Sequence, residues 1–144
     1  MSVKQISVFL ENKPGTLNEM MDILAKADID IRAMALSEAR DFGIARIVVD
    51  DVLETTDVLK TNGYITTLTP VLIVGVPNQA GGLSNVLNIL NNAGVNIEYM
   101  YAILSGEGSE EAFMIFRLHD EAVAEKALAA AGIKMIDQSQ VSEL

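Results

Sequence analysis

The side chains that could support acid–base, metal or nucleophilic chemistry are few in this chain of 144 residues. It has one histidine, His119, beside Asp120, and no cysteine, so no second histidine or cysteine is available to share a metal site. Adjacent acids at 50–51 and 110–111 fit solvated turn residues or weak, unspecific cation binding. We find no nucleophile–base pair, phosphate-binding loop or metal-ligand spacing, so we assign no residue to catalysis and expect no cofactor or metal.

Two arginines and two tyrosines inside predicted strands each have more than one interpretation. Arg32 and Arg46 fit exposed or acid-paired side chains, although an arginine can also grip a carboxylate. Tyr99 and Tyr101 are two residues apart on one strand face. They fit either core or interface packing or the lining of a ligand pocket.

The composition excludes several classes of protein. The formal net charge is −10 and there is no basic cluster, which argues against nucleic-acid binding. The absence of cysteine excludes disulfides and thiolate sites and fits a reducing compartment. The first residues lack the pattern of a signal peptide, and no run reaches the roughly 20 apolar residues that span a bilayer. We therefore expect a cytoplasmic protein with no nucleic-acid or membrane partner.

One stretch of the sequence occurs twice. Residues 11–34 align with residues 77–100 without a gap, which indicates two copies of one structural unit. We therefore predict two domains, residues 1–69 and 70–144. The matched pairs include Asn12 with Asn78, Gly15 with Gly81, Leu17 with Leu83, Ile31 with Ile97, and Met34 with Met100.

Hydrophobic periodicity predicts the order strand–helix–strand–strand–helix–strand in each copy. The fold class is α+β, with two tandem ferredoxin-like βαββαβ units whose antiparallel sheets carry both helices on one face. Residues 64–76 close the first unit and open the second without a flexible linker. The predicted strands are 3–10, 29–38, 42–49, 64–76, 95–105, 111–118 and 133–136, and the later helices are 54–61, 83–93 and 121–131.

Several local signals refine this prediction. Thr16 and Glu19 are three residues apart at the start of the first helix, which predicts a capping box. Gly63, Gly94 and Gly132 are predicted to end helices, Gly63 in the left-handed conformation. Residues 106–108 are predicted as a turn, and the polar tail, residues 137–144, is expected to fray.

Several predicted strands are apolar on both faces, including the segments LIVGV, FMIF and IARIVV. Two helices can cover only one face of a sheet, so the other face requires another sheet or another copy of the chain. We therefore expect a homodimer.

The repeated segments resemble ACT domains. The pattern is a strand, a glycine turn followed by leucine, an amphipathic helix, and a second strand. KPGTL with ADIDI carries it in the first copy, and QAGGL with AGVNI in the second. The chain is similar to small stand-alone tandem ACT proteins. The resemblance implies a regulatory protein that binds an amino acid or related metabolite at the interface between ACT units. The implied ligand-binding residues are Asn12, Gly15, Thr16, Leu17, Asp30, Ile31, Asn78, Gly81, Gly82, Leu83, Asn96 and Ile97.

The physical chemistry of these positions agrees with that implication. A helix start offers unpaired amides to a carboxylate, and a glycine allows close approach to the backbone. In the first copy Thr16 and Glu19 are expected to occupy the helix-start amides. The second copy has Gly82 and Asn85 there, and Asn96 in place of Asp30. We therefore expect residues 78–83 with Asn96 to form the better carboxylate site. Turn geometry alone would also explain Gly15 and Gly81, and it is the favoured explanation for Asn12 and Asn78.

Three functional hypotheses remain. The first is a non-enzymatic sensor that binds a small amino acid and transmits this to a separate effector protein. The second is a ligand-free oligomerisation or interaction module. The third is a small ferredoxin-like hydrolase, which would need an arginine in a loop near the first strand, and neither turn has one.

Overall fold

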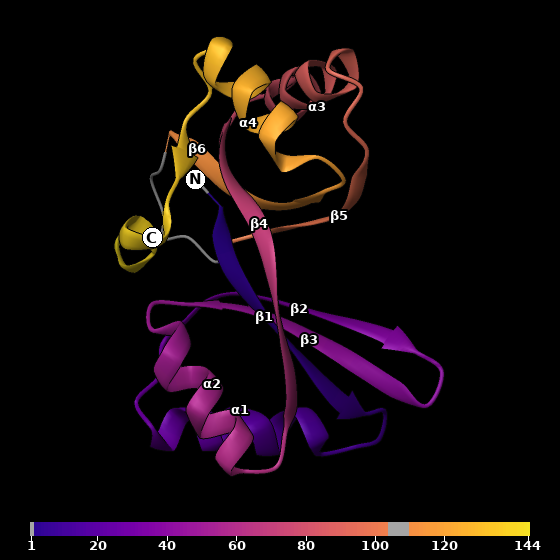
Figure 1. Ribbon diagram of the computed structural model, residues 1–144, viewed down its shortest axis with the longest axis vertical. Coiled ribbons are helices and arrows are strands. Elements are labelled where there is room, and N and C mark those ends of the chain that lie inside the picture. Colours follow the sequence, from indigo (N-terminus) through magenta and orange to yellow (C-terminus); the bar gives the residue numbers. More distant parts are fainter. Residues whose placement is uncertain (1, 104–109) are drawn as a thin grey trace. The chain divides into compact units, whose positions relative to one another are not determined.

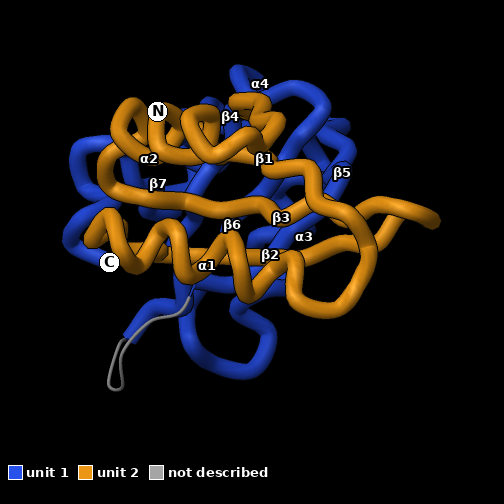
Figure 2. Tube along the Cα trace, turned by 90° about the horizontal axis from the view of Figure 1, so that it is seen from below, with its two compact units in different colours: residues 1–3, 70–144 blue, residues 4–69 orange. Residues whose placement is uncertain are grey.

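The computed structural model describes residues 2–103 and 110–144, so the predicted turn at 106–108 lies outside the described residues. The chain divides into two compact units (Figure 2). The N-terminal unit comprises residues 4–69, and the C-terminal unit comprises residues 70–144 together with 1–3. The boundary falls inside one continuous strand, because β4 runs from Ile65 to Pro77.

The N-terminal unit has the predicted ferredoxin-like order (Figure 1). Its three strands β1, β2 and β3 form an antiparallel arrangement in the order β2-β3-β1, with Ile6 opposite Ile47 and Met34 opposite Ile47. The two helices pack beside each other. The elements are β1 (Val3–Glu11), α1 (Thr16–Lys26), β2 (Ile31–Ala39), β3 (Phe42–Val49), α2 (Val52–Thr61) and the start of β4 (Ile65–Pro77).

The C-terminal unit repeats this architecture. Its antiparallel strands have the order β5-β6-β4, and β7 pairs with β4 at Ile73 and Val74. The tandem ferredoxin-like fold is therefore confirmed. The elements are the end of β4, α3 (Gly82–Asn92), β5 (Ile97–Ala102), β6 (Glu111–Leu118), α4 (Glu121–Ala130), β7 (Met135–Ile136) and the 3-10 helix η1 (Gln138–Glu143).

Each unit has its own hydrophobic core between its helices and one face of its strands. In the N-terminal unit, Met20 and Leu24 of α1 and Leu59 of α2 are fully or almost fully buried. They pack in one cluster with alternate residues of β1 and β3, such as Ile6 and Ile47. The apolar side chains that recur every 3.6 residues in the helices therefore pack against those that recur every second residue in the strands, in a single layer. In the C-terminal unit the corresponding residues include Val86, Leu90, Leu128, Leu72 and Phe116.

The prediction that residues 137–144 fray is wrong. Asp137 begins η1 with a capping box: its Oδ1 accepts from the amides of Ser139 (2.9 Å) and Gln140 (3.2 Å). The side chain of Gln140 accepts in return from the Asp137 amide at 3.0 Å. Val141 is completely buried. The polar residues of this segment therefore cap a short helix, and that helix holds the side chain of Val141 in the core.

Three of the four α-helices in the described residues are followed by a glycine in the left-handed conformation, as the sequence predicted for Gly63 (φ 86°). Gly94 (φ 72°) and Gly132 (φ 73°) do the same. After α1 this position is held by Asp28, with φ 57°, where the second copy has Gly94. An aspartate tolerates this conformation but is less stable there than glycine.

We expect Asp28→Gly to stabilise the N-terminal unit by about 0.5 kcal/mol, because relief of left-handed strain exceeds the extra entropy of the unfolded glycine. Urea unfolding measures this change. The matched control, Asp57→Gly, places glycine inside α2, where it should destabilise by several tenths of a kcal/mol. Loss of stability in both variants would contradict the assignment.

Within the described part of the chain, no helix has both the length and the apolar character needed to cross a membrane.

Candidate functional site

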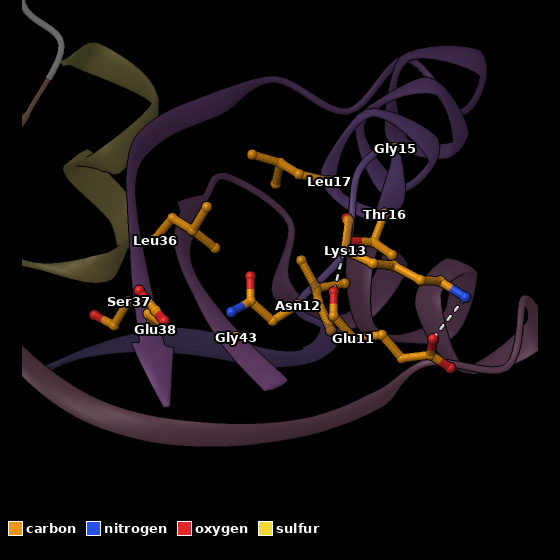
Figure 3. A pocket seen from close by; sticks show the side chains of 11 residues that line it. Glu11, Asn12, Lys13, Gly15, Thr16, Leu17, Leu36, Ser37, Glu38 and Gly43 are labelled. Atoms are coloured by element: carbon orange, nitrogen blue, oxygen red, sulfur yellow. Dashed lines mark hydrogen bonds and ion pairs between the residues drawn. The ribbon is translucent and has the colours of Figure 1, made fainter. Parts of the chain in front are cut away.

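A pocket of about 280 Å³ opens in the N-terminal unit beside the turn between β1 and α1. We call it the first pocket (Figure 3). Its walls come from three segments: the turn itself (residues 10–13 and 15–17), the end of β2 (36–38), and Gly43 of β3. These segments meet because Glu11 lies opposite Phe42, and Phe42 lies opposite Ala39, in the antiparallel register.

The start of α1 differs from the predicted capping box. The helix begins at Thr16 and its N-cap is Gly15, in the left-handed conformation with φ 90°. Thr16 is thus the first helical residue. Its hydroxyl turns backwards and donates to the carbonyls of Glu11 (2.8 Å) and Lys13 (3.1 Å). The prediction that Thr16 and Glu19 occupy the helix-start amides is therefore wrong.

The first turn of α1 begins at the pocket wall, because Gly15, Thr16 and Leu17 all line the pocket. No side chain caps this helix start within the described residues. The amide of Glu19 donates to the Gly15 carbonyl at 2.9 Å, whereas those of Leu17 and Asn18 have no backbone acceptor in the described part of the chain. Unpaired amides at a helix start carry partial positive charge, which stabilises a nearby anion.

Asn12 fixes the turn against the β2–β3 hairpin. Its backbone amide donates to the Asp41 carbonyl at 3.1 Å, and its side-chain Nδ2 donates to the Arg40 carbonyl at 3.1 Å. Asn12 therefore closes the turn, which is one of the two roles considered for it, the other being ligand binding. Its side-chain oxygen faces the space between Leu17 and Leu36 (Figure 3). That oxygen can accept a hydrogen bond from a bound molecule.

The charged side chains of the turn form one ion pair, in which Lys13 Nζ lies 2.7 Å from Glu11 Oε2. This contact lowers the pKa of the Glu11 carboxyl and raises the pKa of the Lys13 ammonium. Both side chains are well exposed, at 73% and 63%, so water screens the pair and either partner can exchange it for another. Glu38 adds a second carboxylate on the β2 wall.

The structure brings some of the predicted ligand-binding residues together and separates others. Asn12, Gly15, Thr16 and Leu17 all line the first pocket. Asp30 and Ile31 lie at the start of β2, whereas the pocket meets β2 from Leu36 onward, about 17 Å further along an extended strand. The reason is topological, because α1 carries the chain back across the sheet before β2 begins.

The second copy of the turn has the same hydrogen bond to its hairpin, since the Asn78 amide donates to the Glu110 carbonyl at 3.0 Å. Gly81 is the left-handed N-cap of α3 (φ 84°), and no side chain caps this helix start among the described residues. The two helix starts are thus alike in their amides, which removes the basis for preferring the second turn. At the other end of the unit, the Asn96 carbonyl accepts from the His119 amide at 3.0 Å, next to Ile97.

Gly82 has a steric role that Thr16 does not share. A Cβ atom at Gly82 would lie 2.0 Å from the carbonyl oxygen of Pro77, which is an impossible contact. The corresponding carbonyl in the first copy, that of Glu11, instead accepts the Thr16 hydroxyl. The second turn is therefore packed more tightly at this point. Leu83, which follows Gly82, is partly buried against the core of its unit.

Sequence reasoning missed the hairpin side of the first pocket, namely Leu36, Ser37, Glu38 and Gly43. The gapless repeat ends at Met34, so it gave no signal for these positions. The predicted topology contained the necessary signal, because in a βαββαβ unit the end of β2 returns to the turn after β1. Among the described residues, no group of three or more histidine, cysteine, aspartate or glutamate side chains could hold a metal ion.

Comparisons with known proteins agree with this architecture. A family model described as an ACT domain pair matches residues 1–144. A crystal structure of a protein from Bacteroides thetaiotaomicron is 34% identical, with a TM-score of 0.92 over 100% of this chain and 98% of that chain. A search of curated proteins finds no match.

Two more distant structures share the fold. The ligand-free regulatory subunit of aspartate kinase from Thermus thermophilus is 18% identical, with a TM-score of 0.67 over 90% of each chain. The aspartate kinase of Clostridium acetobutylicum, an allosteric enzyme, is 14% identical with a TM-score of 0.54, over 89% of this chain and 32% of that one. The same fold thus occurs both in a separate regulatory subunit and within a larger enzyme. The resemblance found in the sequence is confirmed, and the chain belongs to the family of paired ACT domains.

Proposed function

We propose that this ACT pair is a non-enzymatic regulatory protein that binds a small α-amino acid in the first pocket. Membership of a family of regulatory modules supports the regulatory role. One observation supports the ligand class: an uncapped helix start and an apolar wall face the same small pocket. At about 280 Å³, its volume lies just below the roughly 300–1,000 Å³ of pockets for drug-sized ligands, which favours a small metabolite.

The pocket offers a complementary group to each part of such a ligand. The carboxylate would lie at the amide of Leu17, where the helix start stabilises negative charge. The ammonium group would face the Asn12 side-chain oxygen and Glu38. A short apolar side chain would contact Leu10 and Leu36. Binding would act on a partner only if it favours one conformation of the chain over another.

Three expectations from the sequence remain predictions. They are the homodimer, a separate effector protein that receives the signal, and a cytoplasmic location. Exposed apolar side chains such as Ile65 (69%) and Leu68 (48%), both on β4, support a surface that associates with another protein. Sedimentation equilibrium of the purified chain would decide the homodimer.

The proposal is tested by a thermal-shift screen of the twenty amino acids against the parent protein and Leu36→Glu. At 100 times its Kd, a ligand stabilises the folded state by about 2.7 kcal/mol, a rise of several degrees in Tm. Leu36→Glu should abolish that rise, because it replaces the apolar wall with a carboxylate that repels the ligand's own. Leu36 is 54% exposed, so the fold should tolerate the change.

Leu53→Glu is the matched control, because Leu53 is an exposed leucine of the same unit that does not line the pocket. It should retain the full ligand-induced rise. Equal rises in the two variants would exclude the first pocket as the site. Absence of any rise with the parent protein would favour the ligand-free interaction module instead.

A further inference from the structure

A second pocket, of about 310 Å³, lies in the N-terminal unit on the other side of the β1–α1 turn. Besides the turn, its walls include Glu19 of α1, Tyr64 after α2, and Ile65 at the start of β4. The two pockets share the residues of the turn, above all Glu11 and Lys13. The turn is therefore a common wall with a different chemical environment on each side.

The lining of the second pocket is suited to an organic ammonium group. Two carboxylates, of Glu11 and Glu19, line it together with the aromatic side chain of Tyr64. Burial raises the pKa of Tyr64, and the charge of Glu19 raises it further, so the phenol stays neutral and lies within electrostatic reach of that carboxylate. Carboxylates and aromatic faces together attract organic cations. The described residues contain no cluster for a metal ion.

Lys13 is the cation that opposes such a ligand. Its ammonium group is bound to Glu11 at 2.7 Å, and in Figure 3 this pair points away from Asn12 and Leu36. A carboxylate entering the first pocket would attract Lys13, and an ammonium entering the second would attract Glu11. Each ligand would thus compete for one partner of the same exposed ion pair, and the pair has to be separated only once for both.

We propose that the second pocket binds an organic ammonium group, and that it is coupled to carboxylate binding in the first pocket because both ligands draw on the Lys13–Glu11 pair. The coupling part rests on the proposed function, whereas the ammonium site itself does not. By linkage, each ligand raises the affinity for the other by the same factor. For an exposed ion pair we expect a factor of about two to five.

The test is a titration with 1,4-diaminobutane at low ionic strength, followed by NMR of the backbone amides, with 1,4-butanediol as the uncharged control. The amides of Gly63 and Tyr64 line only the second pocket and should shift, whereas that of Gly43 lines only the first and should not. Glu19→Gln should weaken binding about fivefold or more. Asp22→Asn removes an exposed acid of the same helix outside both pockets, and should leave the affinity nearly unchanged.

Lys13→Met gives the sharpest result, because it removes the ammonium group that competes with the diamine for Glu11. This variant can be titrated with the diamine alone, in the absence of any amino acid. Diamine binding should tighten about two- to fivefold, and binding of an amino acid carboxylate in the first pocket should weaken. Equal losses in Glu19→Gln and Asp22→Asn would indicate general attraction to an acidic chain and overturn the site. Unchanged or weaker diamine binding in Lys13→Met would overturn the role of the ion pair. If no amino acid binds but the diamine results hold, the proposed function fails and the ammonium site stands.

Discussion

Gly82→Ala is expected to destabilise the C-terminal unit by about 3 kcal/mol or more. The new Cβ would lie 2.0 Å from the carbonyl oxygen of Pro77, and a backbone atom cannot move aside as a flexible side chain does. Gly82 is a helical residue, and replacement of glycine by alanine in a helix usually gains about 1 kcal/mol. The expected change in stability is thus opposite in sign to the change that helix propensity predicts. Urea unfolding followed by circular dichroism measures the change.

Gly81→Ala is the matched control, one residue away. Its added Cβ would meet nothing within 4 Å, so only the left-handed backbone (φ 84°) opposes it, at a cost of about 1–2 kcal/mol. Gly82→Ala should therefore be clearly the less stable of the two. If Gly82→Ala is as stable as the parent protein, the close approach to Pro77 is wrong.

Arg117→Met is expected to destabilise the C-terminal unit by about 2 kcal/mol at pH 7.5. Arg117 holds three elements together: its guanidinium donates to Glu98 of β5 (3.1 Å), to the Pro70 carbonyl of β4 (3.0 Å) and to Glu121 of α4 (3.4 Å). Methionine keeps much of the apolar stem and removes the charge. The side chain is only about a quarter exposed (27%), so the loss should exceed that of a surface ion pair.

The loss should depend on pH through Glu121. Burial raises the pKa of this carboxyl above its ordinary value of 4.5, and Arg117 partly opposes the rise. Without Arg117, the folded-state pKa rises further above the unfolded one, so the folded state binds the proton more tightly. Stability of the variant therefore falls as the pH rises above about 4.5, and the deficit should be smaller at pH 5 than at pH 7.5.

Two further variants isolate this effect. Adding Glu121→Gln to Arg117→Met should restore part of the stability at pH 7.5, because the half-buried carboxylate is then absent. Arg32→Met removes an arginine that pairs with the better exposed Asp50 and Asp30, and its deficit should not grow over the same pH range. A deficit of Arg117→Met that is constant with pH would exclude Glu121 as its source.

The fold could be predicted from the sequence because the repeat and the periodicity agree. The strands at 42–49 and 111–118 were predicted at their observed bounds. The strands before them were predicted to begin two residues too early, since the amides of Ile29 and Val95 still bond to carbonyls of the preceding helices. The predicted end of the later strand, at residues 104–105, lies outside the described residues. The residues just after a helix are apolar in both cases, and apolar character alone does not distinguish a helix-end turn from a strand. The capped η1 at the end of the chain was missed because its polar residues were interpreted as solvated.

The candidate site was only half predictable. The resemblance led to Asn12 and Gly15 because they are close in sequence and repeated. Leu36 and Glu38 come to the same pocket only through strand register, which no local pattern encodes. Thr16 lines the first pocket, but the hydrogen bond predicted for it was wrong. A one-residue difference in the helix start changes its hydroxyl from acceptor to donor. Arg117 was not singled out, since its three partners lie on separate elements.

Because the packing differs at Thr16 and Gly82, the residue of the second copy can replace that of the first, but not the reverse. A glycine can enter the first turn at the expense of a single hydroxyl contact, whereas a threonine cannot enter the second without displacing main chain. Gene conversion or deliberate grafting between the duplicated segments would therefore succeed in one direction and fail in the other. Since their common ancestor, the duplicates have ceased to be interchangeable, and each is free to specialise only within its own steric limits.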